Sequence, residues 1–138
     1  MNLKWSKEVH FRRDAINGQF PREPGVYRVI QSKPYSRYKG ETRTLKIGQS
    51  ETDLAEEIIR HLVGPHTAKN RLARIRSQPD LTVTVQCILP QQSPTELERK
   101  LLRDFEDKHW ELPLLNSQRG YRRNEDVHYA DIDERSTD

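Results

Sequence analysis

The most regular stretch of the chain runs from Leu81 to Leu89, where large apolar residues alternate with threonine and glutamine. A period of two is the pattern of a β-strand that turns one face to a hydrophobic core. The chain's one cysteine, Cys87, falls on the apolar face, where a thiol serves as a small packing group. This stretch therefore predicts a strand, and the other elements are placed around it.

Five other segments carry periodic or β-branched patterns, and turn residues separate them. The first two read as the strands of an antiparallel hairpin joined by a polar loop over residues 32–43, and the other three read as helices. These segments are residues 25–30, 44–47, about 54–62, 67–76 and 94–109. The order is β-β-α-α-β-α, which predicts a small α+β domain with a three-stranded antiparallel sheet flanked by helices.

Length and composition limit the class of protein. A chain of 138 residues has room for one domain, which we place at residues 24–120, after an N-terminal extension (1–23) and before a polar, acidic C-terminal tail (121–138). Apolar runs stay well short of the length that spans a membrane, and a single cysteine excludes an intrachain disulfide or a multi-cysteine zinc site. We expect an intracellular protein, cytoplasmic or nucleoid-associated.

The net charge of +3 conceals a split along the chain. Residues 124–138 carry a charge of −5, and the remaining residues carry +8. A basic body favours a polyanionic partner, most often nucleic acid, although a solvated charged surface has the same composition. We expect the acidic tail to weaken binding to duplex DNA.

The helix predicted over residues 94–109 contains the most informative carboxylate. Ser93 is its cap, Pro94 stands at the first helical position and Glu96 completes a capping box. At about 100° per residue, Glu98 falls inside the apolar stripe of this helix. A carboxylate in that position needs a partner, which is either an arginine in a salt bridge or the metal or substrate of an active site.

Four short motifs occur in an order that resembles the GIY-YIG nuclease family. They are Gly25-Val26-Tyr27, Lys46-Ile47-Gly48, Leu97-Glu98-Arg99-Lys100-Leu101-Leu102 and Leu115-Asn116. The resemblance covers about residues 24–120 and implies a metal-dependent endonuclease that hydrolyses DNA phosphodiester bonds.

The resemblance also implies a role for each matched residue. Glu98 would ligate Mg²⁺ or another divalent cation, Tyr27 would orient or deprotonate the attacking water, and Lys46 would position a phosphate or a water. Arg60 or His61 would contact the scissile phosphate, and Asn116 would fix the site by hydrogen bonds. Each residue also has a structural interpretation: Tyr27 as core packing, Lys46 as a strand-end lysine, Asn116 as a turn residue.

The chain departs from the family pattern in ways that favour a second interpretation. Lys46 replaces the family's second tyrosine, and the 18 residues between Tyr27 and Lys46 form a longer spacer than is usual. Glu57 stands where the family's helix arginine is expected, and Arg60 is the nearest arginine. A register shift in this helix would reconcile the two patterns. The alternative function is a catalytically weak or inactive module that binds nucleic acid or another protein.

Basic residues outside these motifs predict the DNA-binding surface. They are Lys69, Arg71, Arg74 and Arg76 in the second helix and Arg119 after the last motif. Such residues bind phosphates with an affinity that falls as salt rises. In the polar loop, Tyr35 and Tyr38 alternate with lysine and arginine, a mixture suited to backbone contact and base stacking. With no separate targeting domain in this length, a protein partner is a further source of specificity.

Overall fold

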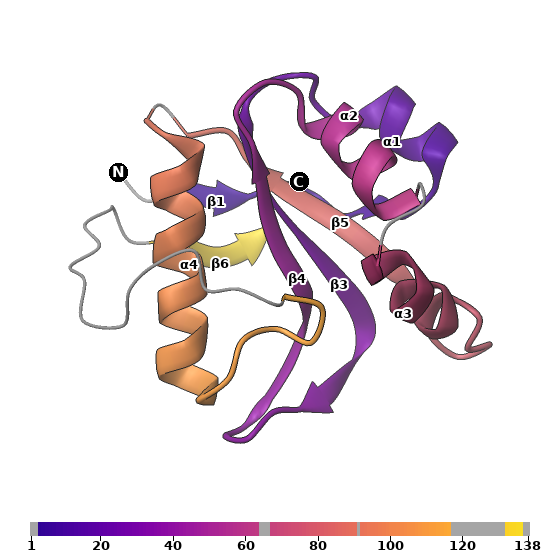
Figure 1. The fold of residues 1–138 in the computed structure, drawn as a ribbon, viewed down its shortest axis with the longest axis vertical. Coiled ribbons are helices and arrows are strands. Elements are labelled where there is room, and N and C mark those ends of the chain that lie inside the picture. Colours follow the sequence, from indigo (N-terminus) through magenta and orange to yellow (C-terminus); the bar gives the residue numbers. More distant parts are fainter. Residues whose placement is uncertain (1–2, 64–66, 91, 117–131, 137–138) are drawn as a thin grey trace.

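The structure is a computed structural model that describes residues 3–63, 67–90, 92–116 and 132–136. Helices and strands follow one another as drawn in Figure 1. In chain order they are β1 (Leu3–Trp5), β2 (Val9–His10), α1 (Arg13–Gln19), β3 (Gly25–Ser36), β4 (Glu41–Ser50), α2 (Leu54–Ile58), the π-helical turn η1 (Ile59–Val63), α3 (Thr67–Arg76), β5 (Val83–Ile88), α4 (Pro94–His109) and β6 (Ile132–Ser136).

The centre of the fold is an antiparallel sheet with the strand order β2-β5-β3-β4. The predicted α+β class is confirmed, but the predicted count of three strands is wrong, because the short strand β2 pairs with the outer side of β5. A two-residue strand without alternation gives no sequence signal, so its pairing could not be expected. In addition, β1 and β6 pair in parallel as a separate two-stranded sheet.

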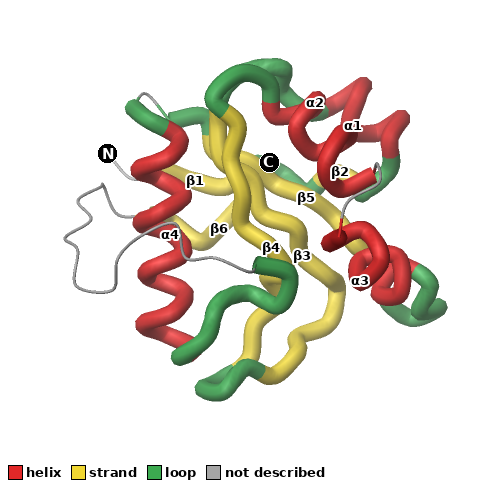
Figure 2. The backbone as a smooth tube through the Cα atoms, viewed as in Figure 1, coloured by secondary structure: helices red, strands yellow, loops and turns green. Residues whose placement is uncertain are grey.

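Helices cover the two faces of the central sheet separately. Figures 1 and 2 show α1, α2 and α3 gathered on one side and α4 on the other, alongside β4. The core on the first side includes Tyr27, Leu45 and Leu54, whereas the core under α4 includes Val26, Ile47 and Leu101. The alternation of Val26 and Tyr27 between these cores follows from the period of two in β3.

A β-bulge in β4 changes the face on which one residue lies. Val29 pairs with Lys46 and Ile30 pairs with Thr44, so Leu45 is the extra residue between the two pairs. Leu45 and Lys46 are adjacent in sequence, yet the bulge places both on the same face of the sheet. Leu45 therefore packs in the same core as Tyr27.

The predicted loop over residues 32–43 is largely strand. β3 continues to Ser36 and β4 starts at Glu41, with Tyr35 paired to Thr42, so the turn itself is only residues 37–40. Gly40 takes a positive φ of 75° in this turn, a conformation that glycine adopts without steric cost. Most side chains of residues 32–43 are exposed, which agrees with the polar composition of the segment.

The helix after β4 changes geometry half-way along. Asp53 caps it by accepting a hydrogen bond from the Glu56 N–H at 3.0 Å, and after Ile58 the chain widens into the π turn η1. Three apolar residues spaced four apart drift by about 80° around a regular α-helix. The wider turn keeps Leu62 in the core with Leu54 and Ile58.

Both ends of the described chain are part of the folded structure. Residues 3–20 contribute β1, β2 and α1, and they bury Trp5, Phe11, Ile16 and Phe20. Part of the acidic tail, residues 132–136, forms β6. No helix in the described ranges has both the length and the apolar composition needed to cross a bilayer.

Candidate functional site

The first site residue, Tyr27, lies in the middle of β3 directly opposite Gly48 of β4. Its ring covers this glycine so closely that a Cβ at position 48 would lie 2.3 Å from the Tyr27 hydroxyl oxygen. Only a residue without a side chain fits beneath the ring, and this explains why the second motif has glycine at position 48. Burial raises the pKa of the Tyr27 phenol well above its ordinary value, and the charges of Glu57 and Glu98 raise it further.

Lys46 and Glu98 approach this tyrosine from two different elements. Lys46 lies two pairs further along β4 from Gly48, on the same face of the sheet, and Glu98 comes from the second turn of α4. Both side chains are half-buried. Burial lowers the pKa of Lys46, partly opposed by the charges of Glu98 and Glu57. The opposite charges of Lys46 and Glu98 are therefore close enough to act on each other.

The pKa of the Glu98 carboxyl lies close to neutral pH. Burial raises its pKa to about 7, against the opposing effect of Lys46, and the charge of Glu57 adds to the increase. The capping predicted for its helix is present, since Ser93 Oγ accepts a hydrogen bond from the Glu96 N–H and Pro94 occupies the first turn. The sequence prediction that Glu98 lies toward the sheet agrees with its half-buried position.

Glu57 is the member of the site that sequence reasoning did not select. It is half-buried on α2, and its charge acts on Tyr27, Lys46 and Glu98 alike. Its position next to the apolar stripe of Leu54 and Ile58 was the available signal. The site thus holds two carboxylates and one ammonium group around a buried phenol.

Of the two candidates for phosphate contact on this helix, His61 is the one connected to the site. Its Nε2 lies 3.1 Å from Glu57 Oε2, one turn away. Arg60 is exposed, and none of the interactions described here joins it to Tyr27, Lys46 or Glu98. The π turn begins between Glu57 and these two residues, so it determines which side chain faces the site.

Asn116 fixes the strand that carries Lys46. Its Nδ2 donates a hydrogen bond to the Ile47 carbonyl oxygen at 2.8 Å, and its Oδ1 accepts one from the Ile47 N–H at 2.9 Å. The Leu115 N–H donates to the Leu45 carbonyl oxygen at 2.8 Å. The predicted role of Asn116, holding the site by hydrogen bonds, agrees with this geometry.

The basic residues predicted to bind DNA divide between described and undescribed parts of the chain. Arg71, Arg74 and Arg76 are exposed on α3. Arg71 donates to the Leu114 carbonyl oxygen at 3.4 Å, which ties α3 to the segment before Asn116. Arg119 and the side chain of Lys69 lie outside the described residues.

Comparison with family models, with curated proteins and with solved structures gives no match for this chain. Within the described residues there is no cluster of three or more histidine, cysteine, aspartate or glutamate side chains placed to hold a metal ion. Two cavities lie on the α4 face of the sheet, both lined in part by Arg28 and Lys108, and neither is lined by Tyr27, Lys46 or Glu98.

Proposed function

We propose that the chain is a metal-dependent endonuclease of the GIY-YIG type, acting on phosphodiester bonds of DNA. The observation that supports this most is the position of Glu98. A half-buried carboxylate on α4 acts on Lys46 of β4 and on the Tyr27 phenol of β3, so three groups that are far apart in sequence share one electrostatic environment.

A divalent cation suits the charge balance of this site. The charge of Glu57 adds to the cost of ionising the half-buried Glu98, and a cation would offset that cost. Glu98 would hold the ion, and having few protein ligands fits Mg²⁺, which keeps several of its waters. When bound, the ion would stabilise negative charge on the phosphate.

The other residues then have chemically distinct tasks. Burial favours the protonated form of the Tyr27 phenol, which would orient the attacking water through a hydrogen bond. The Lys46 ammonium group donates to a phosphate oxygen as charge builds there. In the reaction the water oxygen bonds to phosphorus and releases a proton to the surrounding water. The bond to the leaving sugar oxygen breaks, and that oxygen takes up a proton from the surrounding water, so that one water molecule is added across the bond.

The test is cleavage of supercoiled plasmid by the purified chain, with Mg²⁺ and with EDTA. We expect nicking with Mg²⁺ only, its loss in Glu98→Gln, and unchanged DNA binding by that variant. Asp107→Asn is the matched control, because Asp107 is an exposed carboxylate on the same helix. Full cleavage by Glu98→Gln would contradict the assignment of Glu98.

A second function is favoured by one specific observation, the carboxylate of Glu57 at the place of the family's arginine. In the absence of a cation, a second negative charge beside Glu98 opposes the approach of a phosphate. The chain would then be a non-catalytic module that binds nucleic acid through the exposed arginines of α3. Salt-dependent binding by the wild type without any Mg²⁺-dependent cleavage would select this second function.

A further inference from the structure

Two exposed aromatic rings lie side by side on the surface far from Tyr27. Tyr38, at the tip of the β3–β4 hairpin, is 76% exposed, and Trp110, directly after α4, is 59% exposed. Their ring centroids are 5.5 Å apart with an angle of 32° between the planes. Water-exposed faces of tryptophan and tyrosine at such a distance form a platform on which a further flat ring can stack.

The backbone holds this platform in place from both sides. The Lys39 N–H donates to the His109 carbonyl oxygen at 3.0 Å, and His109 Nδ1 lies 2.9 Å from the Lys39 carbonyl oxygen. The Tyr38 N–H donates to the Glu111 carboxylate. The hairpin tip is thus fixed to the end of α4, although the two are about 70 residues apart in sequence.

The backbone of Trp110 is in the left-handed conformation, which is unfavourable for a residue with a large side chain. It has a positive φ of 63°, and it ends α4 by donating its N–H to the Glu106 carbonyl oxygen at 2.7 Å. Glycine or asparagine ordinarily fills this left-handed position at a helix end. The large Trp110 ring is more than half exposed at this position, so it is available for contact with a ligand.

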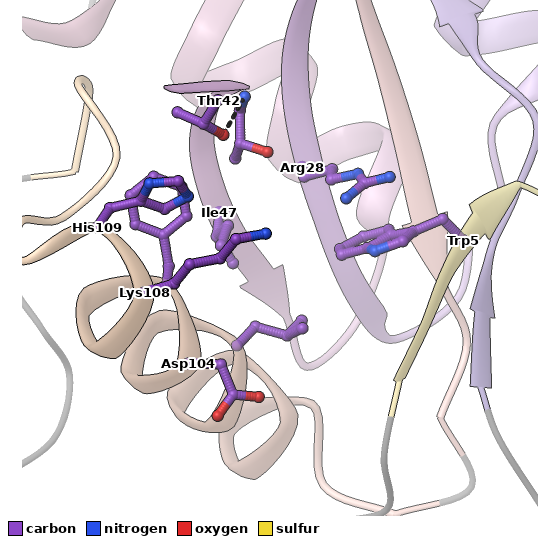
Figure 3. A pocket seen from close by; sticks show the side chains of 10 residues that line it. Trp5, Arg28, Thr42, Ile47, Asp104, Lys108 and His109 are labelled. Atoms are coloured by element: carbon purple, nitrogen blue, oxygen red, sulfur yellow. Dashed lines mark hydrogen bonds between the residues drawn. The ribbon is translucent and has the colours of Figure 1, made fainter. Parts of the chain in front are cut away.

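Positive and hydroxyl groups surround the platform and the cavity next to it. Lys39 Nζ lies 5.2 Å from the centre of the Trp110 ring. The adjoining cavity, about 450 Å³, lies between α4 and the sheet, and Lys108 points across it toward Arg28 (Figure 3). Thr42 and Thr44 also line it. The nearby carboxylates of Asp104 and Glu111 have cationic partners, at 2.9 Å from Lys100 and 3.5 Å from Arg37 respectively.

We propose that Tyr38 and Trp110 bind unpaired nucleobases, with Lys108 and Arg28 contacting the adjoining phosphates. The proposal rests on the proposed function in taking nucleic acid as the partner. Stacking on aromatic side chains beside cations is how proteins bind single strands without reading their sequence. Trp110 directly follows α4 and lies 12 residues after Glu98, about 18 Å along the helix axis, so several unpaired nucleotides would separate the platform from the cleavage site.

The test measures the affinity of labelled oligonucleotides in EDTA, where no cleavage occurs. The probes are a mixed-sequence single-stranded DNA, its RNA counterpart and the DNA duplex. Trp110→Asn preserves the left-handed backbone, and we expect it to weaken single-strand binding by about five- to 150-fold, the effect of losing one base stack. Duplex binding should change less than about twofold. Tyr38→Ala should act in the same direction, while Leu89→Ala, an exposed apolar residue outside the platform, should have no effect.

A spectroscopic measurement tests the contact directly. Tryptophan fluorescence should be quenched by the single strand much more in the wild type than in Trp110→Phe, where only Trp5 remains, buried with the Arg28 guanidinium 4.3 Å from its ring centre. Unchanged single-strand affinity in both platform variants would overturn the proposal, as would equal weakening of single-strand and duplex binding. A change of oligomeric state in Trp110→Asn without a change of affinity would assign the rings to a protein contact. Platform binding without plasmid cleavage would reject only the nuclease function.

Discussion

Replacing Glu98 by glutamine is expected to stabilise the folded chain, and to do so only at neutral and alkaline pH. The pKa of Glu98 rises from 4.5 to about 7 on folding, so the folded chain binds more protons than the unfolded chain between these values. The free energy of unfolding therefore falls as pH rises through this window. Glutamine has a similar shape and no charge, so the variant does not undergo this loss.

The magnitude follows from the same two values. Each pKa unit corresponds to about 1.4 kcal/mol, so ionised Glu98 costs the folded chain about 3 kcal/mol at pH 8 and less than about 1 kcal/mol at pH 5. In a chain of this length, a gain of about 2–3 kcal/mol raises the Tm by roughly 6–12 °C. The difference between Glu98→Gln and the wild type should thus grow by about 2 kcal/mol from pH 5 to pH 8.

Thermal and urea unfolding followed by circular dichroism, in EDTA at several pH values, measures this difference. Asp107→Asn on the exposed side of α4 controls for the loss of a helix carboxylate. A loss of stability in Glu98→Gln at pH 8 would refute the reasoning, because it would show that the ion pair with Lys46 outweighs the cost of burial. A gain that does not vary with pH would refute it equally.

The neighbouring carboxylate provides a companion prediction. Because Glu57 contributes to the high pKa of Glu98, Glu57→Gln should lower that pKa and move the midpoint of the stability curve to lower pH. Glu56→Gln, which removes an exposed carboxylate from the same helix turn, should leave the midpoint unchanged. Equal midpoints in the two variants would show that Glu57 does not act on Glu98.

Two further predictions concern the backbone around the site. Gly48→Ala should cost several kcal/mol in unfolding free energy, because a Cβ there would lie 2.3–2.7 Å from three atoms of Tyr27. The control is Gly18→Ala, which has open space around it and should stabilise α1 by about 0.5–1 kcal/mol. Equal effects of the two variants in urea unfolding would contradict the close approach of Tyr27 to Gly48. Asn116→Ala should cost about 1–3 kcal/mol and increase hydrogen exchange at the Ile47 amide, and unchanged exchange there would show that another group protects it.

Elements with strong local signals were predictable from the sequence. The alternation around Cys87 gave β5, and Ser93 with Pro94 gave the start of α4, because period and capping chemistry act over a few residues. Trp5 and Phe11 gave no such signal, since Trp5 ends a strand of three residues and Phe11 directly follows a strand of two. Their burial depends on pairing with residues distant in sequence.

Three residues of the candidate site could be selected from the sequence, but the charged groups that surround them could not. Tyr27, Lys46 and Glu98 could be selected from short motifs and a helical stripe. The participation of Glu57 depended on how α2 is oriented over the sheet, and the choice of His61 over Arg60 depended on a π turn. A π turn has no simple sequence period, so the face that these side chains present could not be assigned in advance.

The hydrogen bonds of Asn116 have a consequence beyond the site. β4 is the outermost strand of the central sheet, and the open edge of such a strand can pair with a strand of another molecule. The Asn116 amide occupies both polar groups of Ile47 there, and the Leu115 N–H occupies the Leu45 carbonyl. Together they act as a short substitute strand that blocks intermolecular pairing along this stretch. Substitutions at Asn116 should therefore promote aggregation of the otherwise folded chain at high concentration.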